Sequence, residues 1–118
     1  MAVFKRKQRK VINFDFGYVE DGVDKVLHFE TVHSKALADK LVDMGRLAKD
    51  DMSIEEQKEY LTRAYDEILG DGAMNTIREK LYDNEELLIT DLVDIGYYLV
   101  DEVERVNKLL ESEYGTRA

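Results

Sequence analysis

Residues 11–32 read VINFDFGYVEDGVDKVLHFETV, and this stretch decides how the fold begins. The Asp21-Gly22 dipeptide is a strong two-residue turn signal, and alternating β-branched and aromatic residues flank it. With this loop, Phe14 faces Phe29, and the large apolar residues share one face. We therefore predict an antiparallel β-hairpin over residues 11–32. Its apolar face needs a covering layer, because an isolated two-stranded ribbon is only marginally stable.

The opposite face of the predicted hairpin is mostly polar, and it brings the Asp15 carboxylate opposite His28, with Glu30 two residues further along. Carboxylates beside an imidazole can form a general base or a pH switch. This face is expected to lie open to solvent, and no nucleophile accompanies it. We therefore interpret the three residues as surface pairs. A metal site built from His28 and His33 is disfavoured, because their spacing matches no ligand pattern.

Apolar residues at helical spacing follow the hairpin and predict four helices. The clearest boundaries belong to the second, which a capping box opens at Ser53 and Gly70 ends. Ser34 is a fair N-cap for the first helix, and Asp83 and Asn84 can cap the last. The predicted helices cover residues 34–49, 53–69, 72–81 and 85–113. The fold class is therefore α+β and mostly helical, with an N-terminal hairpin and a long final helix.

The final predicted helix is the largest element, with about 29 residues and a length of about 43 Å. Gly96 lies beside Tyr97 and Tyr98, where a neighbouring element could approach closely. The carboxylates between its apolar positions form a solvated face. Its apolar stripe is wide, so only part of it needs to face its own domain. The main line of that stripe is Leu88, Leu92, Ile95, Leu99, Val103, Val106 and Leu110.

The composition and the motif content exclude several classes of function. The 118 residues are 44% hydrophobic and include no Cys, which excludes a disulfide framework, a thiolate zinc site and a cysteine nucleophile. No apolar run approaches the roughly 18 residues needed to span a bilayer. No catalytic triad, metal box or cofactor fingerprint is present, and Gly70-Asp71-Gly72 lacks the rest of a phosphate loop. We therefore expect a protein that is not an enzyme and has no cofactor and no membrane association.

Charge divides the chain into a basic start and an acidic body. Five of the 17 Lys and Arg residues lie within residues 1–10, which leaves 12 against all 26 acids and a charge of −14 for residues 11–118. Such a body repels a phosphate backbone, so direct nucleic-acid binding is disfavoured. We interpret residues 1–10 as a basic flexible tail and residues 11–118 as one α+β domain. A charge-steered contact of the tail with an acidic partner or a neighbouring subunit is the alternative.

The order of these parts resembles the tail assembly chaperone proteins of long-tailed bacteriophages of Gram-positive hosts. The segment YDEILGDGA, residues 65–73, carries the closest local likeness, and the pattern covers most of the chain. The resemblance implies a homo-oligomeric phage or prophage protein of the host bacterial cytoplasm. Its implied role is to bind the helical tape measure protein and keep it soluble until tail tube subunits polymerise around it.

A partner helix would need an apolar contact surface, and the long helix is the natural place for it. The residues predicted to form this surface are Leu92, Ile95, Leu99, Val103 and Val106. Two alternatives stay open. One is an oligomeric structural or head-tail joining component of a phage particle. The other is an acidic protein that mimics nucleic acid and inhibits a host DNA-binding protein.

Overall fold

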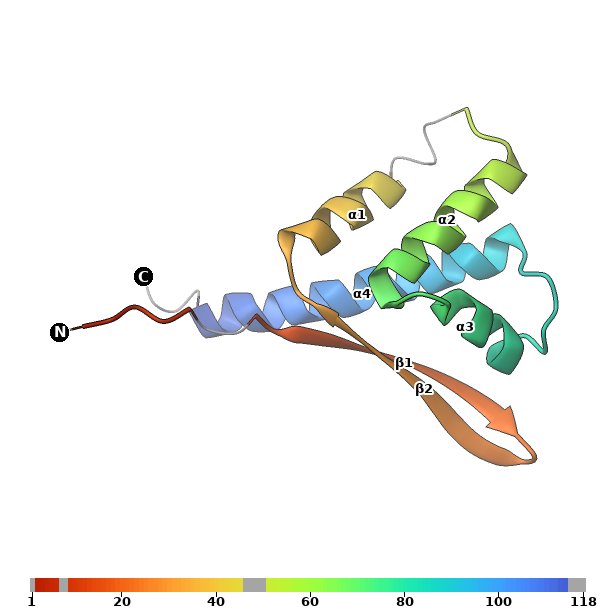
Figure 1. Ribbon diagram of the computed structural model, residues 1–118, viewed down its shortest axis with the longest axis horizontal. Helices are drawn as coiled ribbons and strands as arrows, with labels where there is room; N and C mark the ends of the chain where they lie inside the picture. The colour runs from red at the N-terminus through yellow and green to blue at the C-terminus, as the bar shows by residue number, and fades with distance from the viewer. Residues whose placement is uncertain (1, 7–8, 46–50, 115–118) are drawn as a thin grey trace.

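The computed structural model describes residues 2–6, 9–45 and 51–114, and it confirms the α+β class. An N-terminal hairpin precedes four helices, the last of them long (Figure 1). The elements are β1 (Val11–Glu20), β2 (Val23–Val32), α1 (Lys35–Gly45), α2 (Ile54–Leu69), α3 (Ala73–Leu81) and α4 (Ile89–Tyr114).

The hairpin has the register that the sequence predicts, with Phe14 opposite Phe29 and Asp15 opposite His28. Asp21 and Gly22 have φ values of 53° and 75°, and positive φ at both central residues is the geometry of a type I′ turn. The β1 side chains that face the helices are fully or nearly fully buried. The apolar face of the ribbon therefore forms one wall of the core.

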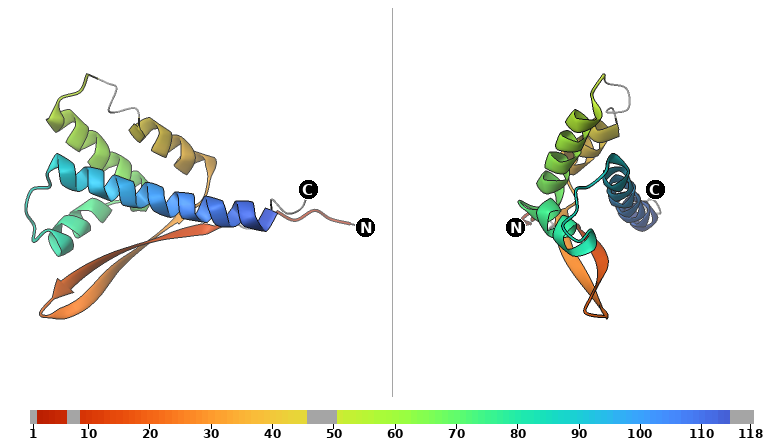
Figure 2. Two further views of the ribbon diagram at one scale, coloured as in Figure 1. Left: turned by 180° about the vertical axis from the view of Figure 1, so that it is seen from behind. Right: turned by 90° about the vertical axis from the view of Figure 1, so that its right-hand side faces the viewer.

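Helices α3 and α4 pack against β1, while α2 contacts both β2 and the other helices. Figure 2 shows α4 running along the length of the molecule, with the hairpin crossing on one side and α1 and α2 on the other. The radius of gyration is 17.0 Å, whereas a compact chain of this length would have about 13.5 Å. The molecule is therefore elongated, at 59 × 42 × 25 Å.

Two polar contacts hold the hairpin on the helices. The Tyr98 hydroxyl accepts the Asp15 N–H and donates to the Asp15 carbonyl, both at 2.9 Å. These bonds satisfy main-chain groups of β1 that β2 does not use, so Tyr98 protects part of an open strand edge. The Thr31 hydroxyl donates to the Ile68 carbonyl at 2.6 Å, where the last turn of α2 leaves carbonyls without helical partners.

The predicted ends of α2 are confirmed. The Ser53 hydroxyl oxygen accepts the Glu56 N–H at 3.2 Å, and Gly70 follows the helix with a φ of 125°. Helix α3 begins at Ala73, one residue later than predicted, because Gly72 takes the left-handed conformation of a cap. Helix α1 is observed as far as Gly45, and the rest of its predicted range, residues 46–49, lies outside the described residues.

The start of the final helix was predicted incorrectly, since α4 begins at Ile89 rather than at residue 85. Asp83 and Asn84 have φ values of 52° and 65°, so they form a turn instead of capping the helix directly. The cap lies at Leu88, whose N–H donates to the Asp91 carboxylate at 2.8 Å. Leu88, which was predicted in the apolar stripe of the final helix, is 62% exposed and precedes the helix.

Candidate partner-binding groove

The five residues predicted to contact a partner lie mainly inside the protein's own core. The exposed fractions of Leu92, Ile95, Leu99 and Val103 are 1%, 4%, 0% and 6%, and Val106 is partly buried against the same cluster. The apolar face of the hairpin and α2 cover this line of α4. These side chains therefore stabilise the fold and offer no free contact surface while it is intact.

A different side of α4 stays open. Ile89, Val93, Gly96, Tyr97 and Val100 line one wall of a groove of about 310 Å³. Helix α1 supplies the opposite wall, and α2 supplies the floor. We call this hollow the apolar groove, and its remaining lining residues are Leu41, Met44, Gly45, Gln57, Leu61 and Tyr65.

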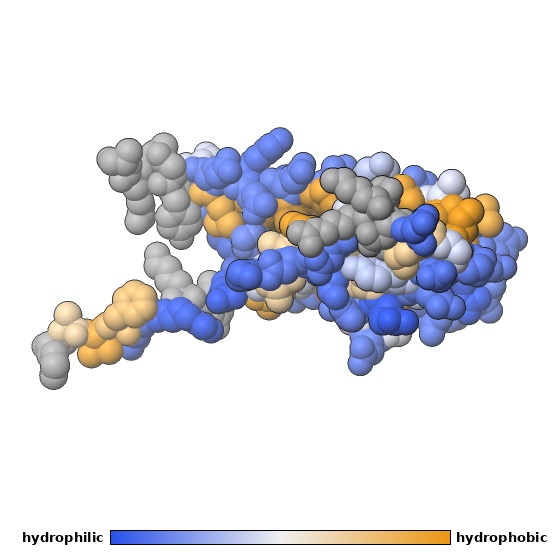
Figure 3. Space-filling view, turned by 90° about the horizontal axis from the view of Figure 1, so that it is seen from above, coloured by the Kyte–Doolittle hydropathy of each residue, from blue (hydrophilic) through white to orange (hydrophobic). Residues whose placement is uncertain are grey.

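The walls of the apolar groove expose side chains that ordinarily lie inside proteins. Val93 is 38% exposed and Tyr97 is 67% exposed, and contiguous exposed apolar surface is typical of interaction sites. Figure 3 looks onto this side of the molecule and shows apolar side chains at its surface among hydrophilic ones. Sequence reasoning found the wide stripe of α4 but chose its central line, which is the buried one.

The floor of the groove is set by a close helix contact at Gly96. The Tyr65 hydroxyl donates to the Leu92 carbonyl at 2.6 Å, and a Cβ added at Gly96 would lie 2.5 Å from that hydroxyl oxygen. Glycine thus lets α2 approach α4 here, as expected from its place beside two tyrosines. Burial raises the pKa of Tyr65 above its ordinary value, so the hydroxyl stays protonated and remains a donor.

The α4 wall is strongly acidic. Residues 89–104 of α4 contain five Asp and Glu residues and no Lys or Arg. Asp94, Asp101 and Glu104 are exposed and lie within two helical turns of Tyr97. We call these three carboxylates the acidic rim. Charge of one sign along an apolar groove favours a ligand of the opposite sign.

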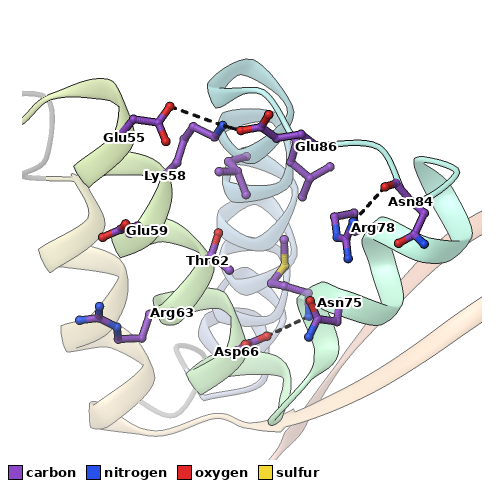
Figure 4. Close-up of a pocket in the computed structure, with 13 residues that line it drawn as sticks. Glu55, Lys58, Glu59, Thr62, Arg63, Asp66, Asn75, Arg78, Asn84 and Glu86 are labelled. Atoms are coloured by element: carbon purple, nitrogen blue, oxygen red, sulfur yellow. Dashed lines mark hydrogen bonds and ion pairs between the residues drawn. The ribbon is translucent and has the colours of Figure 1, made fainter.

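A second, larger hollow lies between α2, α3 and residues 84–87, with a volume of about 810 Å³ (Figure 4). Several of its charged groups form contacts within the fold. The Lys58 ammonium pairs with Glu86 at 2.8 Å, which lowers the pKa of that carboxyl. The Arg78 guanidinium donates to the Asn84 carbonyl at 2.9 Å and holds the turn before α4. This polar hollow is therefore best explained as structural.

Asp66 has a role that the sequence analysis missed. Its carboxylate accepts the Met74 N–H at 2.8 Å and so caps α3 from the preceding helix. Gly72, the residue at the cap position, has no side chain to do this. The sequence did hold a signal for this role, because Gly72 before the predicted third helix has no side chain to cap it, so another residue has to do so.

The predicted pairing on the outer face of the hairpin is present. His28 Nδ1 lies 2.5 Å from an Asp15 oxygen, and His28 Nε2 lies 3.2 Å from a Glu30 oxygen. Hydrogen bonding to Asp15, and then to Glu30, raises the pKa of His28 above its ordinary value. The three side chains are about half exposed or more. Within the described residues, no group of three or more His, Asp or Glu side chains could hold a metal ion.

None of the described helices is both long enough and apolar enough to cross a membrane. Comparison of the chain with protein-family models, with curated proteins and with solved structures found no match.

Proposed function

We propose that this protein is a non-enzymatic binding protein that holds an amphipathic helix of a partner in the apolar groove. The resemblance to tail assembly chaperones gives the partner as the tape measure protein, which would be kept soluble during tail assembly in the host bacterial cytoplasm. The observation that carries the proposal is the exposed apolar wall of α4 between Ile89 and Val100.

The dimensions of the groove suit a helix. The groove-lining residues of α4 extend over about 16 Å, or three helical turns. An amphipathic helix that lies along such a wall presents apolar side chains at positions i, i+3 or i+4, and i+7. Val93 and Tyr97 are one turn apart and would contact successive side chains of that set. The acidic rim favours a partner helix with basic residues beside its apolar stripe.

The acidic body supports the solubilising part of the role. The charge of −14 on residues 11–118 makes bound complexes repel each other. A long, largely apolar helical partner would otherwise associate through its own exposed stripes. In this proposal the groove binds the partner helix, and the outer carboxylates keep the bound complexes apart in solution.

The test is co-expression with the tape measure protein of a long-tailed phage of a Gram-positive host. We expect wild-type protein to raise the soluble fraction of the tape measure protein and to co-purify with it. The double variant Val93→Lys/Tyr97→Lys should lose both effects, because it places two ammonium groups in the groove. The matched control is Leu109→Lys, which changes an exposed apolar residue of α4 outside the groove.

Circular dichroism checks that each variant keeps its helices. Solubilisation by the groove variant at the wild-type level would refute the groove assignment. Equal loss with Leu109→Lys would show that charge on α4, rather than the groove, controls the effect.

A further inference from the structure

The residues before β1 combine exposed apolar and basic side chains. Within this stretch, which we call the N-terminal arm (residues 2–10), Phe4 is 93% exposed and Val3 is 74% exposed. Lys5 and Arg6 follow directly, and the described arm residues belong to no helix or strand. When another protein surface covers an almost fully exposed phenylalanine, apolar area is removed from water, and this favours association.

We propose that the N-terminal arm of one copy docks in the apolar groove of a second copy. Phe4 enters between the two walls and contacts Val93 and Tyr97. Lys5 and Arg6 lie against the acidic rim. The occupant is thus a second copy of this chain, and the contact joins the basic start of one molecule to the acidic helix of another.

Charge complementarity is the first argument. Residues 1–10 carry five of the 17 basic residues of the chain, while residues 89–104 of α4 carry five acids and no base. Both surfaces are also apolar at their centres, with Phe4 and Val3 on the arm and the groove walls on α4. Opposite charges around matching apolar surface steer association and fix its register.

Reach is the second argument, and it favours an intermolecular contact. Lys10 Nζ lies 3.7 Å from a Glu113 carboxylate oxygen, so the arm leaves the body near the C-terminal end of α4. Figure 1 shows the arm continuing past that end, away from the helices. From Glu113 back to Tyr97 is about 24 Å along the helix. The six residues from Lys10 to Phe4 span at most about 20–22 Å when fully extended.

The arm of a molecule therefore points away from its own groove, and only a full reversal close to its extended length would return Phe4 to Tyr97, whereas a second copy can accept the arm in the direction that it already takes. An arm and a groove at different places on the surface make a heterologous contact. Such a contact closes by reciprocal exchange in a dimer or by head-to-tail addition in a ring. In either case each groove receives an arm from another copy.

This inference rests on the proposed function, because the arm would occupy the same groove as the partner helix. In the free protein the arm of a second copy covers the apolar walls, and a partner helix displaces it. Self-association and partner binding are therefore competitive but separable, since only self-association needs the arm.

The experiment is a measurement of solution mass by light scattering over a range of protein and salt concentrations. We expect wild-type protein to exceed the 13.7 kDa monomer mass, and its association to weaken as added salt screens the charges. The arm variant Phe4→Ser/Lys5→Glu/Arg6→Glu and the groove variant Val93→Lys/Tyr97→Lys should each associate at least tenfold more weakly. The charge-preserving variant Lys5→Arg/Arg6→Lys should behave as wild type.

Mixing the two defective variants gives the sharpest result. The arm variant keeps an intact groove and the groove variant keeps an intact arm, so an equimolar mixture should form a one-to-one complex of twice the monomer mass. A mixture that stays monomeric would overturn the inference, as would a wild-type protein that is monomeric at every concentration. If the arm variant still solubilises the tape measure protein, the proposed function stands whatever happens to self-association.

Discussion

Replacement of Gly96 by alanine tests the contact that sets the floor of the apolar groove. In most exposed helix interiors this change stabilises a protein by about 1 kcal/mol, because alanine has the higher helix propensity. Here the new Cβ would lie 2.5 Å from the Tyr65 hydroxyl oxygen and 3.6 Å from Cζ. The ring cannot move away freely, since Tyr65 is 1% exposed and its hydroxyl donates to the Leu92 carbonyl.

The steric cost should therefore exceed the helix gain. Overpacking of a filled core costs about 1–3 kcal/mol, and the displaced Tyr65 hydrogen bond costs about 1 kcal/mol. After subtraction of the propensity gain, Gly96→Ala should lower the free energy of unfolding by about 1–3 kcal/mol. For a domain of this size the melting temperature should fall by about 4–12 °C.

A double-mutant cycle with Tyr65→Phe, measured by urea and thermal unfolding, isolates the contact. Tyr65→Phe alone removes the hydroxyl and should cost about 1 kcal/mol. In that background the nearest ring atom stays at an ordinary contact distance, so Gly96→Ala should be neutral or stabilising by up to about 1 kcal/mol. An equal effect of Gly96→Ala in both backgrounds would refute the reasoning, as would stabilisation of the wild type.

Three further predictions concern other parts of the fold. The raised pKa of His28 should be visible by NMR titration, and Asp15→Asn should return it toward its ordinary value. Because that pKa is raised by folding, the stabilisation is fully present below the unfolded-state pKa of about 6.5 and is lost as pH rises through the folded-state pKa. Asp66→Ala should cost about 1 kcal/mol in urea unfolding through loss of the α3 cap, whereas Asp71→Ala at the exposed turn should stay within about 0.5 kcal/mol of wild type. Leu99→Ala should cost about 2–5 kcal/mol, since it opens a cavity at a fully buried position, and a change below about 1 kcal/mol would place this side chain outside the core.

The register of the hairpin could be predicted from local sequence alone. Its register follows from a two-residue loop that needs positive φ and from strands that alternate with period two. A slip by one residue would expose the phenylalanines, so only one pairing satisfies both constraints. The same locality explains the confirmed ends of α2, where Ser53 caps the first turn and Gly70 follows the last.

The start of α4 shows where local signals fail. Asp83 and Asn84 are good capping residues and also tolerate the left-handed conformation, so their identity fits either role. The turn is selected because Arg78 binds the Asn84 carbonyl and Leu87 enters the core. The Arg78 contact is local, but the burial of Leu87 needs the other elements of the core to be in place, and no short window of sequence shows it.

The sequence by itself determined the class of fold, the hairpin register, the four helices and the separation of basic arm from acidic body. Each of these depends on turn chemistry, residue spacing or charge along the chain. Only the tertiary structure decided which side of the wide α4 stripe is buried. A helical stripe of that width can be covered from either flank, and the choice depends on where β1, α2 and α1 pack. The apolar groove exists because the hairpin and α2 cover one line of α4, while Val93 and Tyr97 on the next line remain exposed.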